Sequence, residues 1–193
     1  MNISSMKKLV IIFAFLITAF TLSAQTTLNE SGVYELKVVE NYDSVKATTL
    51  YERSLVALSD VVGSYEKSKT NIDVAEKDAG VIVYKGELYL GFKKVNISCG
   101  YDTFAVFTLK VRCKDGKVQY TITVPSLHMY WSCNINDNEV VPLKEIIPDF
   151  THKGRLYYLK KGAVEFAGSL DSNMQSLQKS IVLKTKASAE DDF

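Results

Sequence analysis

The stretch from Thr108 to Val124, TLKVRCKDGKVQYTITV, constrains the fold of this chain more than any other part of its sequence. Apolar and polar residues alternate on both sides of Asp115-Gly116, a dipeptide typical of a two-residue type I′ turn. The register around this turn predicts apolar cross-strand pairs on one face and polar pairs on the other: Cys113 with Val118, Val111 with Tyr120, Leu109 with Ile122 and Phe107 with Val124, then Lys110 with Thr121 and Arg112 with Gln119. A shift of one residue would exchange the two faces, so turn and alternation together predict one β-hairpin.

The first 24 residues have the layout of a secretory signal peptide. Two lysines form a short basic start, an uncharged apolar run extends from Leu9 to Leu22, and small residues, Ser23 and Ala24, follow it. A membrane anchor is the alternative, but the run is shorter than the roughly 20 apolar residues that a span needs. No cysteine lies near the end of the run, so the chain lacks the attachment site of a lipoprotein. We therefore expect cleavage after Ala24 and a periplasmic or secreted chain with no transmembrane span.

Removal of this leader changes the formal charge of the chain from +1 to −1, because the leader holds two lysines and no acidic residue. A near-neutral chain has no bulk attraction for nucleic acid or anionic lipid, so we expect no nucleic-acid partner. Residues 25–182 have a length that is ordinary for a single domain. The short acidic end, residues 185–193, is expected to fray.

The segment before the hairpin predicts a strand, a helix and two further strands. The alternation over 33–39 predicts a strand with Tyr34 and Leu36 on its core face. Apolar residues at helical spacing then predict a helix over 44–64, with Asp43 or Ser44 as its N-cap and Gly63 as its end. Two β-branched runs separated by the turn residues EKDAG follow, and Gly86 and Gly91 indicate a bulge or bend in the second run.

The segment after the hairpin predicts a break, a connection and a final helix. Pro125 cannot donate a ladder hydrogen bond, so it marks a break or bulge, beyond which the apolar alternation changes frame. Residues 125–168 are read as a variable connection. A helix is then predicted over 169–184, with Ser169 or Asp171 as its cap. Its apolar stripe consists of Leu170, Met174, Leu177 and Ile181.

The order of these elements predicts an α+β fold. Strand, helix, several antiparallel strands and a second helix form one sheet with both helices packed on one face. The other face of the sheet is expected to be more open.

The segment YEKSKTNIDVAEKDAGVIVYKGEL, residues 65–88, followed by the hairpin FTLKVRCKDGKVQYTITV, resembles the DUF4468 family. This family comprises exported proteins of Bacteroidota that have a TBP-like fold and an unknown function. The likeness covers about residues 33–124, and its motifs are turns, strand alternation and a glycine. The resemblance therefore implies a TBP-like fold and supplies no catalytic or binding residues, because a shared fold does not transfer its namesake's function.

Cysteine and histidine are sparse, and they limit the chemistry of the chain. Cys99, Cys113 and Cys133 allow at most one intrachain disulfide, so either Cys113 and Cys133 are bonded between neighbouring strands or all three thiols are free. No cysteine pair has the close spacing of a structural zinc site. Neither His128 nor His152 lies in a nucleophile motif. The sequence therefore predicts no metal, no cofactor and no catalytic residue.

The candidate binding residues are Thr121, Thr123, His128 and Tyr130. If Trp131 faces the core, these four side chains share the more open face of the sheet, which is half apolar and suited to recognition. The alternative is that residues 126–167 fold over this face and cover it.

These observations favour an exported, non-catalytic module that binds an unknown protein or small ligand in the cell envelope. The alternative is a structural or accessory envelope protein whose sheet covers itself. A hydrolase with an unrecognised site ranks last of the three. An uncovered face would favour binding, and a sealed face would favour the accessory role.

Overall fold

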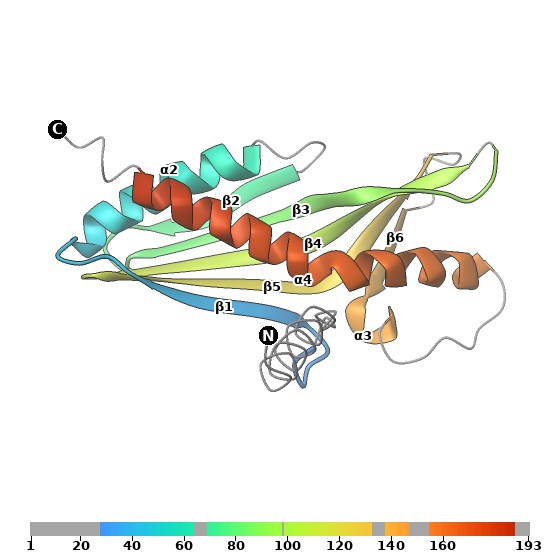
Figure 1. Cartoon of the computed structure of the whole chain (residues 1–193), viewed down its shortest axis with the longest axis horizontal. Coiled ribbons are helices and arrows are strands. Elements are labelled where there is room, and N and C mark those ends of the chain that lie inside the picture. Colours follow the sequence, from blue (N-terminus) through green and yellow to red (C-terminus); the bar gives the residue numbers. More distant parts are fainter. Residues whose placement is uncertain (1–27, 64–68, 98, 133–137, 147–154, 188–193) are drawn as a thin grey trace, which may run out of the picture.

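The computed structural model describes residues 28–63, 69–97, 99–132, 138–146 and 155–187. The predicted signal peptide lies outside these residues. In chain order the elements are β1 (Tyr34–Asn41), α2 (Ala47–Gly63), β2 (Lys69–Glu76), β3 (Val81–Lys94), β4 (Gly100–Lys114), β5 (Lys117–Trp131), β6 (Asn138–Pro142), α3 (Leu143–Ile146) and α4 (Arg155–Ala187). The antiparallel sheet has the order β1-β5-β4-β3-β2. β6 pairs with β5 along the same edge as β1, beyond the Tyr34 end of that strand (Figure 1).

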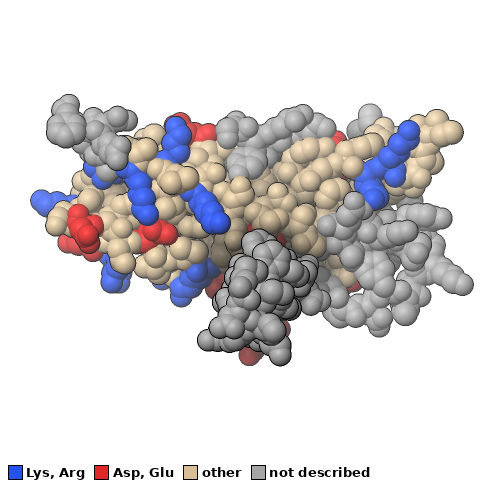
Figure 2. Space-filling model, in the orientation of Figure 1, with Lys and Arg blue, Asp and Glu red and all other residues tan. Residues whose placement is uncertain are grey.

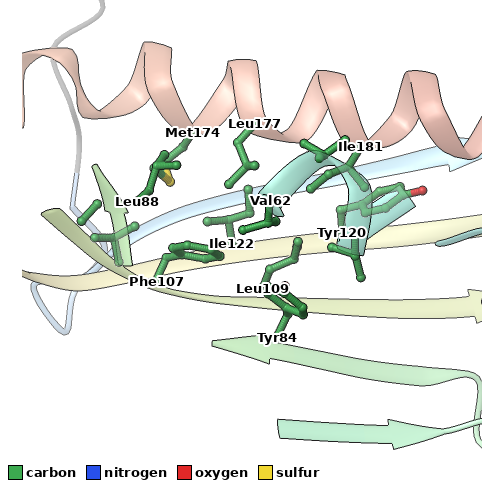
Figure 3. Close-up of a cluster of buried hydrophobic side chains, with 14 of the residues drawn as sticks. Val62, Tyr84, Leu88, Phe107, Leu109, Tyr120, Ile122, Met174, Leu177 and Ile181 are labelled. Carbon is green, nitrogen blue, oxygen red and sulfur yellow. The ribbon is translucent and has the colours of Figure 1, made fainter. Parts of the chain in front are cut away.

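Both long helices pack on one face of the sheet, here named the helix face. The four stripe residues predicted for the final helix, now part of α4, are fully buried: Leu170, Met174, Leu177 and Ile181. α2 lies beside α4 and buries its own stripe: Leu50, Tyr51, Ala57, Leu58, Val61 and Val62. Figure 3 shows the stripe of α4 directed at the strands. Each large apolar side chain that leaves water here contributes roughly 1.5–3 kcal/mol to folding.

The strands contribute the other half of the core through every second residue. The buried residues on the helix face of β3, β4 and β5 include Ile82, Tyr84, Leu88, Phe107, Leu109, Val111, Val118, Tyr120 and Ile122. The residues between them point to the opposite face, here named the open face, and no helix in the described part of the chain packs there. The predicted α+β arrangement, with two helices on one face of an antiparallel sheet, is confirmed.

The hairpin of β4 and β5 has the predicted register as far as Leu109, which lies opposite Ile122. The predicted pairing of Phe107 with Val124 is wrong, because β5 gains one residue at this point. Pro125 sits in the resulting bulge, where the ladder needs no hydrogen bond from it. The extra residue inverts the alternation of β5 beyond the bulge, as the change of frame in the sequence predicted.

The bend in β3 is placed by Gly91 and not by Gly86. The pairing of β3 with β4 shifts between Tyr89 and Gly91, whereas Gly86 pairs regularly with Phe107. Gly91 has a φ of 148°, and a Cβ atom added there would lie 2.8 Å from the ring of Phe166 in α4. Glycine is therefore required at this bend both by the backbone angle and by the approach of the helix.

The turn between β4 and β5 differs from the predicted type I′. Only Gly116 of the two turn residues has a positive φ, 71°, and type I′ requires it at both. The turn instead rests against the link between β1 and α2. The N–H of Gly116 donates to the carbonyl of Val45, and the N–H of Tyr42 donates to the carbonyl of Gly116, both at 2.8 Å. Contacts outside the hairpin thus help to set the turn.

The start of α2 also depends on this turn. The helix begins at Ala47, later than predicted, and Ser44 has a φ of 63° that keeps it out of the helix. Neither Asp43 nor Ser44 caps the helix. Asp115 in the hairpin turn accepts a hydrogen bond from the N–H of Ala47 at 2.8 Å and so takes this role.

The C-terminal helix is twice as long as predicted, because α4 begins at Arg155 and not at 169. Ser169 and Asp171 therefore lie inside the helix and do not cap it. The hydroxyl of Tyr34 in β1 donates to Asp171 at 2.8 Å, which ties the helix to the sheet edge. The expected connection over 125–168 accordingly contains the end of β5, then β6, α3 and the first turns of α4.

The expectation of a frayed end over 185–193 is wrong for residues 185–187. Thr185 is fully buried in α4, which continues to Ala187. Residues 188–193 lie outside the described part of the chain.

Candidate functional site

The four predicted binding residues, Thr121, Thr123, His128 and Tyr130, all lie in β5 and point to the open face. Their neighbours in the strand, such as Ile122 and Met129, are fully buried on the helix face. The described parts of residues 126–167 extend the sheet as β5 and β6 or join α4, and they do not cover this face. The alternative of a sheet covered by its own connection is therefore wrong for the described residues.

Glu87 of β3 is the centre of a polar cluster at one end of the open face. Its Oε1 atom lies 2.6 Å from Nδ1 of His128, and its Oε2 atom accepts a hydrogen bond from the hydroxyl of Tyr130 at 2.8 Å. The side chains of Glu87 and His128 are each only 18% exposed. With Glu87 ionised, Nδ1 carries the hydrogen, so the carboxylate fixes both the orientation and the tautomer of the imidazole.

Aromatic rings surround this carboxylate cluster. The rings of His128 and Tyr130 lie 4.1 Å apart, and Phe104 of β4 meets Tyr130 edge-on at 5.3 Å. Tyr89 of β3 packs against Phe104 at 5.3 Å. These contacts hold the cluster as a rigid unit that has an apolar body and a polar centre.

The burial of this cluster changes the acidity of Tyr130. Burial, the hydrogen bond to Glu87 and the negative charge of Glu87 together raise the pKa of Tyr130 to about 12. The phenol therefore remains a hydrogen-bond donor at physiological pH. Both oxygens of Glu87 are occupied by His128 and Tyr130, so the carboxylate holds the imidazole and the phenol in place.

The middle of the open face is lined with threonines. Thr123 lies opposite Thr108 of β4, and Thr121 lies opposite both Lys110 of β4 and Lys37 of β1. These three threonines are partly exposed. Their hydroxyls continue a polar strip from the Glu87 cluster towards the β4–β5 turn.

Sequence reasoning found His128 and Tyr130 but missed Glu87. Glu87 lies in β3, and its approach to His128 depends on the pairing of β3 with β4, which the glycine pattern alone does not specify. The only signal in the sequence is one acidic residue in a strand otherwise made of apolar residues, glycines and lysines.

Both alternatives for the cysteines are wrong, the disulfide between Cys113 and Cys133 and the set of three free thiols. Cys113 is a free thiol buried on the helix face, 3.9 Å from the hydroxyl of Ser54 in α2. Burial raises the pKa of Cys113 to about 11, so the thiol is neutral and unreactive at physiological pH. Cys99 is the cysteine that takes part in a disulfide, and Cys133 lies outside the described residues.

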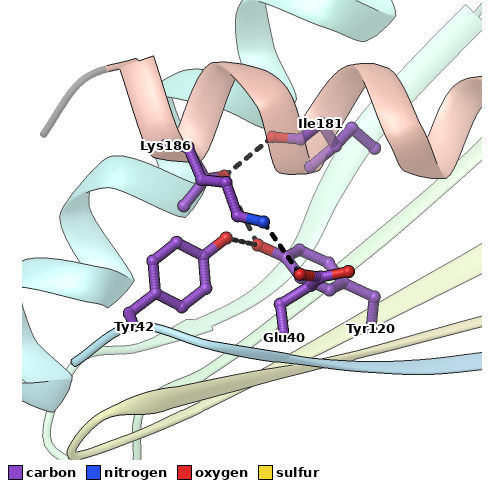
Figure 4. A network of polar contacts seen from close by, with 6 residues as sticks. Glu40, Tyr42, Tyr120, Ile181 and Lys186 are labelled. Atoms are coloured by element: carbon purple, nitrogen blue, oxygen red, sulfur yellow. Dashed lines mark hydrogen bonds and ion pairs between the residues drawn. The ribbon is translucent and has the colours of Figure 1, made fainter.

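A second polar cluster lies on the helix face of the sheet, at the C-terminal end of α4 (Figure 4). The hydroxyls of Tyr42 and Tyr120 are hydrogen-bonded at 3.3 Å, and Tyr120 donates to the hydroxyl of Thr185 at 3.4 Å. Lys186 forms an ion pair with Glu40 above them at 2.9 Å. Burial raises the pKa of both tyrosines. We interpret this cluster as structural, because its hydroxyl groups satisfy one another inside the core.

Two further features are absent from the part of the chain that the structure describes. No group of three or more His, Cys, Asp and Glu side chains is placed to hold a metal ion there. None of the described helices is long and apolar enough to cross a membrane.

The fold is similar to two solved structures from Bacteroidota. A TBP-like protein from Parabacteroides distasonis superposes with a TM-score of 0.53 at 11% identity, over 81% of this chain and 96% of its own. A DUF4468 family protein from Bacteroides ovatus superposes with a TM-score of 0.52 at 13% identity, over 81% of this chain and 90% of its own. Identities this low show a shared fold and carry no function.

Among curated proteins, none matches this sequence. A family model does match it over residues 37–127, that of the domain of unknown function (DUF4468) with TBP-like fold. The matched range runs from β1 into β5 and includes Glu87, Thr121 and Thr123, whereas His128 and Tyr130 lie just beyond it. Sequence match and fold agree, and residues 37–127 of this chain form a DUF4468 domain.

Proposed function

We propose that this chain is an exported, non-catalytic binding module that recognises a partner in the cell envelope through the open face of its sheet. Export is inferred from the predicted signal peptide. The observation that carries the binding role is the cluster of Glu87, His128 and Tyr130. A half-buried carboxylate and an oriented imidazole occupy a face that the described helices leave uncovered.

Exposed apolar side chains at the border of this cluster support the same role. Val140 of β6 lies opposite His128 and is 59% exposed, and Phe92 of β3 lies opposite Asp102 and is 50% exposed. Exposed apolar groups beside oriented polar ones are typical of recognition surfaces. A structural envelope protein that covers its own sheet would be expected to bury these side chains.

The arrangement of Glu87 supports binding over catalysis. A general base needs a free oxygen within reach of a substrate proton, and both oxygens of Glu87 are already bonded. The experiment that separates the roles is capture of partners from envelope extract by the tagged chain, expressed with its own leader. We expect Thr121→Trp, which places a bulky ring on the open face, to abolish capture of the partner.

Thr48→Trp is the matched control, because Thr48 is an exposed residue of α2 on the other side of the molecule. Both variants must retain the thermal unfolding midpoint of the parent chain. Capture that survives Thr121→Trp, or that is lost equally in Thr48→Trp, would contradict the proposal. Turnover of an ester or glycan substrate that disappears in His128→Ala would replace the binding role by a hydrolytic one.

A further inference from the structure

Five basic side chains gather on the open face at the end nearest the β4–β5 turn, here named the basic end. They come from three adjacent strands: Lys37 of β1, Lys110, Arg112 and Lys114 of β4, and Lys117 of β5. Within the described residues, none of the five forms an ion pair. Like charges this close repel one another, and the negative charge of an anionic ligand bound at the basic end would reduce this repulsion.

The pairing of the strands sets the shape of the basic end. Lys37 and Lys110 lie on either side of Thr121 in one cross-strand row, and Arg112 lies opposite Gln119 in the next row. Lys114 and Lys117 form the last row before the turn. With strands about 4.8 Å apart and about 3.4 Å per residue along a strand, the charges spread over roughly 10 by 13 Å. This area fits several anionic groups joined in a chain better than one small ion.

The surface is also hollowed at this end. A shallow cavity of about 240 Å³ is lined by Val39, Arg112, Lys114, Lys117 and Gln119. Glu35 of β1, one row beyond Lys37 and opposite Thr123, ends the basic stretch on that strand. The cavity is therefore lined by three cations, one amide and one apolar side chain.

Near the C-terminal end of α4, by contrast, basic side chains are paired with acidic ones. On the side that carries α4, basic and acidic side chains lie close together near the end of that helix (Figure 2). There Lys184 pairs with Asp60 at 3.4 Å, and Lys186 pairs with Glu40 at 2.9 Å. Since the whole chain carries a formal charge of only +1, the basic end reflects segregation of charge and not an excess of it.

The neighbours of these cations indicate which anion they suit. Val39, 53% exposed, is the one large apolar side chain that lines the cavity, so an acidic peptide would find little apolar surface to bury its side chains against. Hydroxyl and amide groups continue along the face instead, from Gln119 through Thr121 to Thr123. Such groups exchange hydrogen bonds with a hydroxyl-rich ligand. Beyond them lies the aromatic cluster of His128 and Tyr130, whose rings can stack on the apolar faces of sugar rings.

From this sequence of cations, hydroxyls and aromatic rings, we infer that the open face binds an acidic polysaccharide, with its carboxylate groups at the basic end. The inference rests on the proposed binding function of the open face and names the class of its ligand. The basic end binds the carboxylate groups at one end of the ligand, and the threonines and aromatic rings contact the neighbouring sugars.

The test is a binding titration by fluorescence anisotropy with a labelled polygalacturonate oligomer and the chain expressed with its own leader. We expect saturable binding that weakens by at least about ten-fold between 50 and 200 mM salt, because several counterions are released. The double variant Lys110→Glu/Arg112→Glu should weaken binding by at least about ten-fold. The double variant Lys144→Glu/Lys179→Glu reverses the same charge at exposed positions of α3 and α4, away from the open face, and should change affinity by less than about two-fold.

Three results would overturn the inference: no binding of the oligomer, equal loss in the two double variants, or equal affinity for single-stranded DNA or poly-glutamate of the same charge. The last would make the basic end a general polyanion surface. Failure of the proposed function is distinguishable, because it appears as partner capture that survives Thr121→Trp. Capture that is lost in Thr121→Trp and kept in Lys110→Glu/Arg112→Glu would retain the binding face and refute its acidic ligand.

Discussion

Nδ1 of His128 in β5 lies 2.6 Å from Oε1 of Glu87 in β3, although β4 runs between the two strands. The contact is diagonal across the sheet, because Glu87 is opposite Val106 whereas His128 is opposite Phe104. A contact of this kind braces three strands on the face that lacks helices in the described part of the chain. The same contact orients the groups proposed to meet the ligand.

The first prediction concerns the acidity of Tyr130. Glu87→Gln removes the negative charge beside the phenol and leaves its burial, so the pKa of Tyr130 should fall from about 12 towards its ordinary value of 10.0. An NMR titration of ring-labelled tyrosine measures this change. Glu76→Gln, at an exposed position of β2, is the control and should leave Tyr130 unchanged. An unchanged pKa in Glu87→Gln would contradict the described cluster.

The second prediction concerns the buried thiol of Cys113. Its pKa is raised from 9.0 to about 11 in the folded state, so the folded chain holds this proton more tightly than the unfolded chain does. The resulting stability is fully present below pH 9 and is lost as the pH rises to about 11. Urea unfolding across this window should show a steeper fall in the parent chain than in Cys113→Ala, by about 1–3 kcal/mol in total.

The comparison with Cys113→Ala is needed because several tyrosines also have raised pKa values. These tyrosines lower the stability of both chains at high pH. Cys113 should also resist a thiol reagent at pH 8 until the chain is unfolded. Parallel pH profiles for the two chains, or fast labelling of the folded chain, would contradict the buried neutral thiol.

The third prediction concerns the cap of α2. Asp115→Ala removes the carboxylate that accepts the N–H of Ala47, and should lower the free energy of unfolding by about 1 kcal/mol. Asp115→Asn keeps an acceptor oxygen and should cost less. Asp78→Ala, an exposed aspartate in the turn between β2 and β3, is the matched control and should be close to neutral. Equal urea midpoints for all four chains would refute the long-range cap.

The fourth prediction is a stabilising substitution. Thr103 of β4 is fully buried, and within the described residues its hydroxyl has no hydrogen-bond partner. Thr103→Val keeps the shape and removes an unsatisfied polar group, so unfolding should cost about 1 kcal/mol more. Thr185→Val is the control at an equally buried threonine, whose hydroxyl donates to Ile181 and accepts from Tyr120. Thermal melts should move in opposite directions, and a loss of stability in both would contradict this description of Thr103.

The sequence predicted the parts of the fold that depend on local chemistry. The Asp115-Gly116 turn and the alternation around it placed Leu109 opposite Ile122, and the helical spacing of Leu170 and Met174 identified the buried face of α4. Each of these features is set by residues close to one another in the chain.

The predictions that were wrong concern features that depend on contacts between distant segments of the chain. The pairing of Phe107 with Val124 failed because the bulge at Pro125 adds a residue to β5, and the register shift already includes Val124, one residue before the proline. The cap of α2 comes from Asp115, far along the chain. The early start of α4 has no recognisable cap in the sequence.

For the same reason, the sequence predicted only part of the candidate site. His128 and Tyr130 share a strand, so alternation alone put them on one face. Glu87 joins them only through the register of β3 on β4, and the basic end forms only when β1 pairs with β5 beside β4. Because the formal charge of the whole chain is near zero, its composition gives no sign of the basic end.

The most direct test of the proposed binding through the open face uses threonine methyl groups as reporters. Methyl NMR spectra of the selectively labelled chain are recorded with and without its captured partner. The account predicts shifts or broadening at Thr108, Thr121 and Thr123, with Thr48 in α2 and Thr185 in the core unchanged. Changes centred on Thr48, with the three open-face methyl groups unaffected, would contradict it.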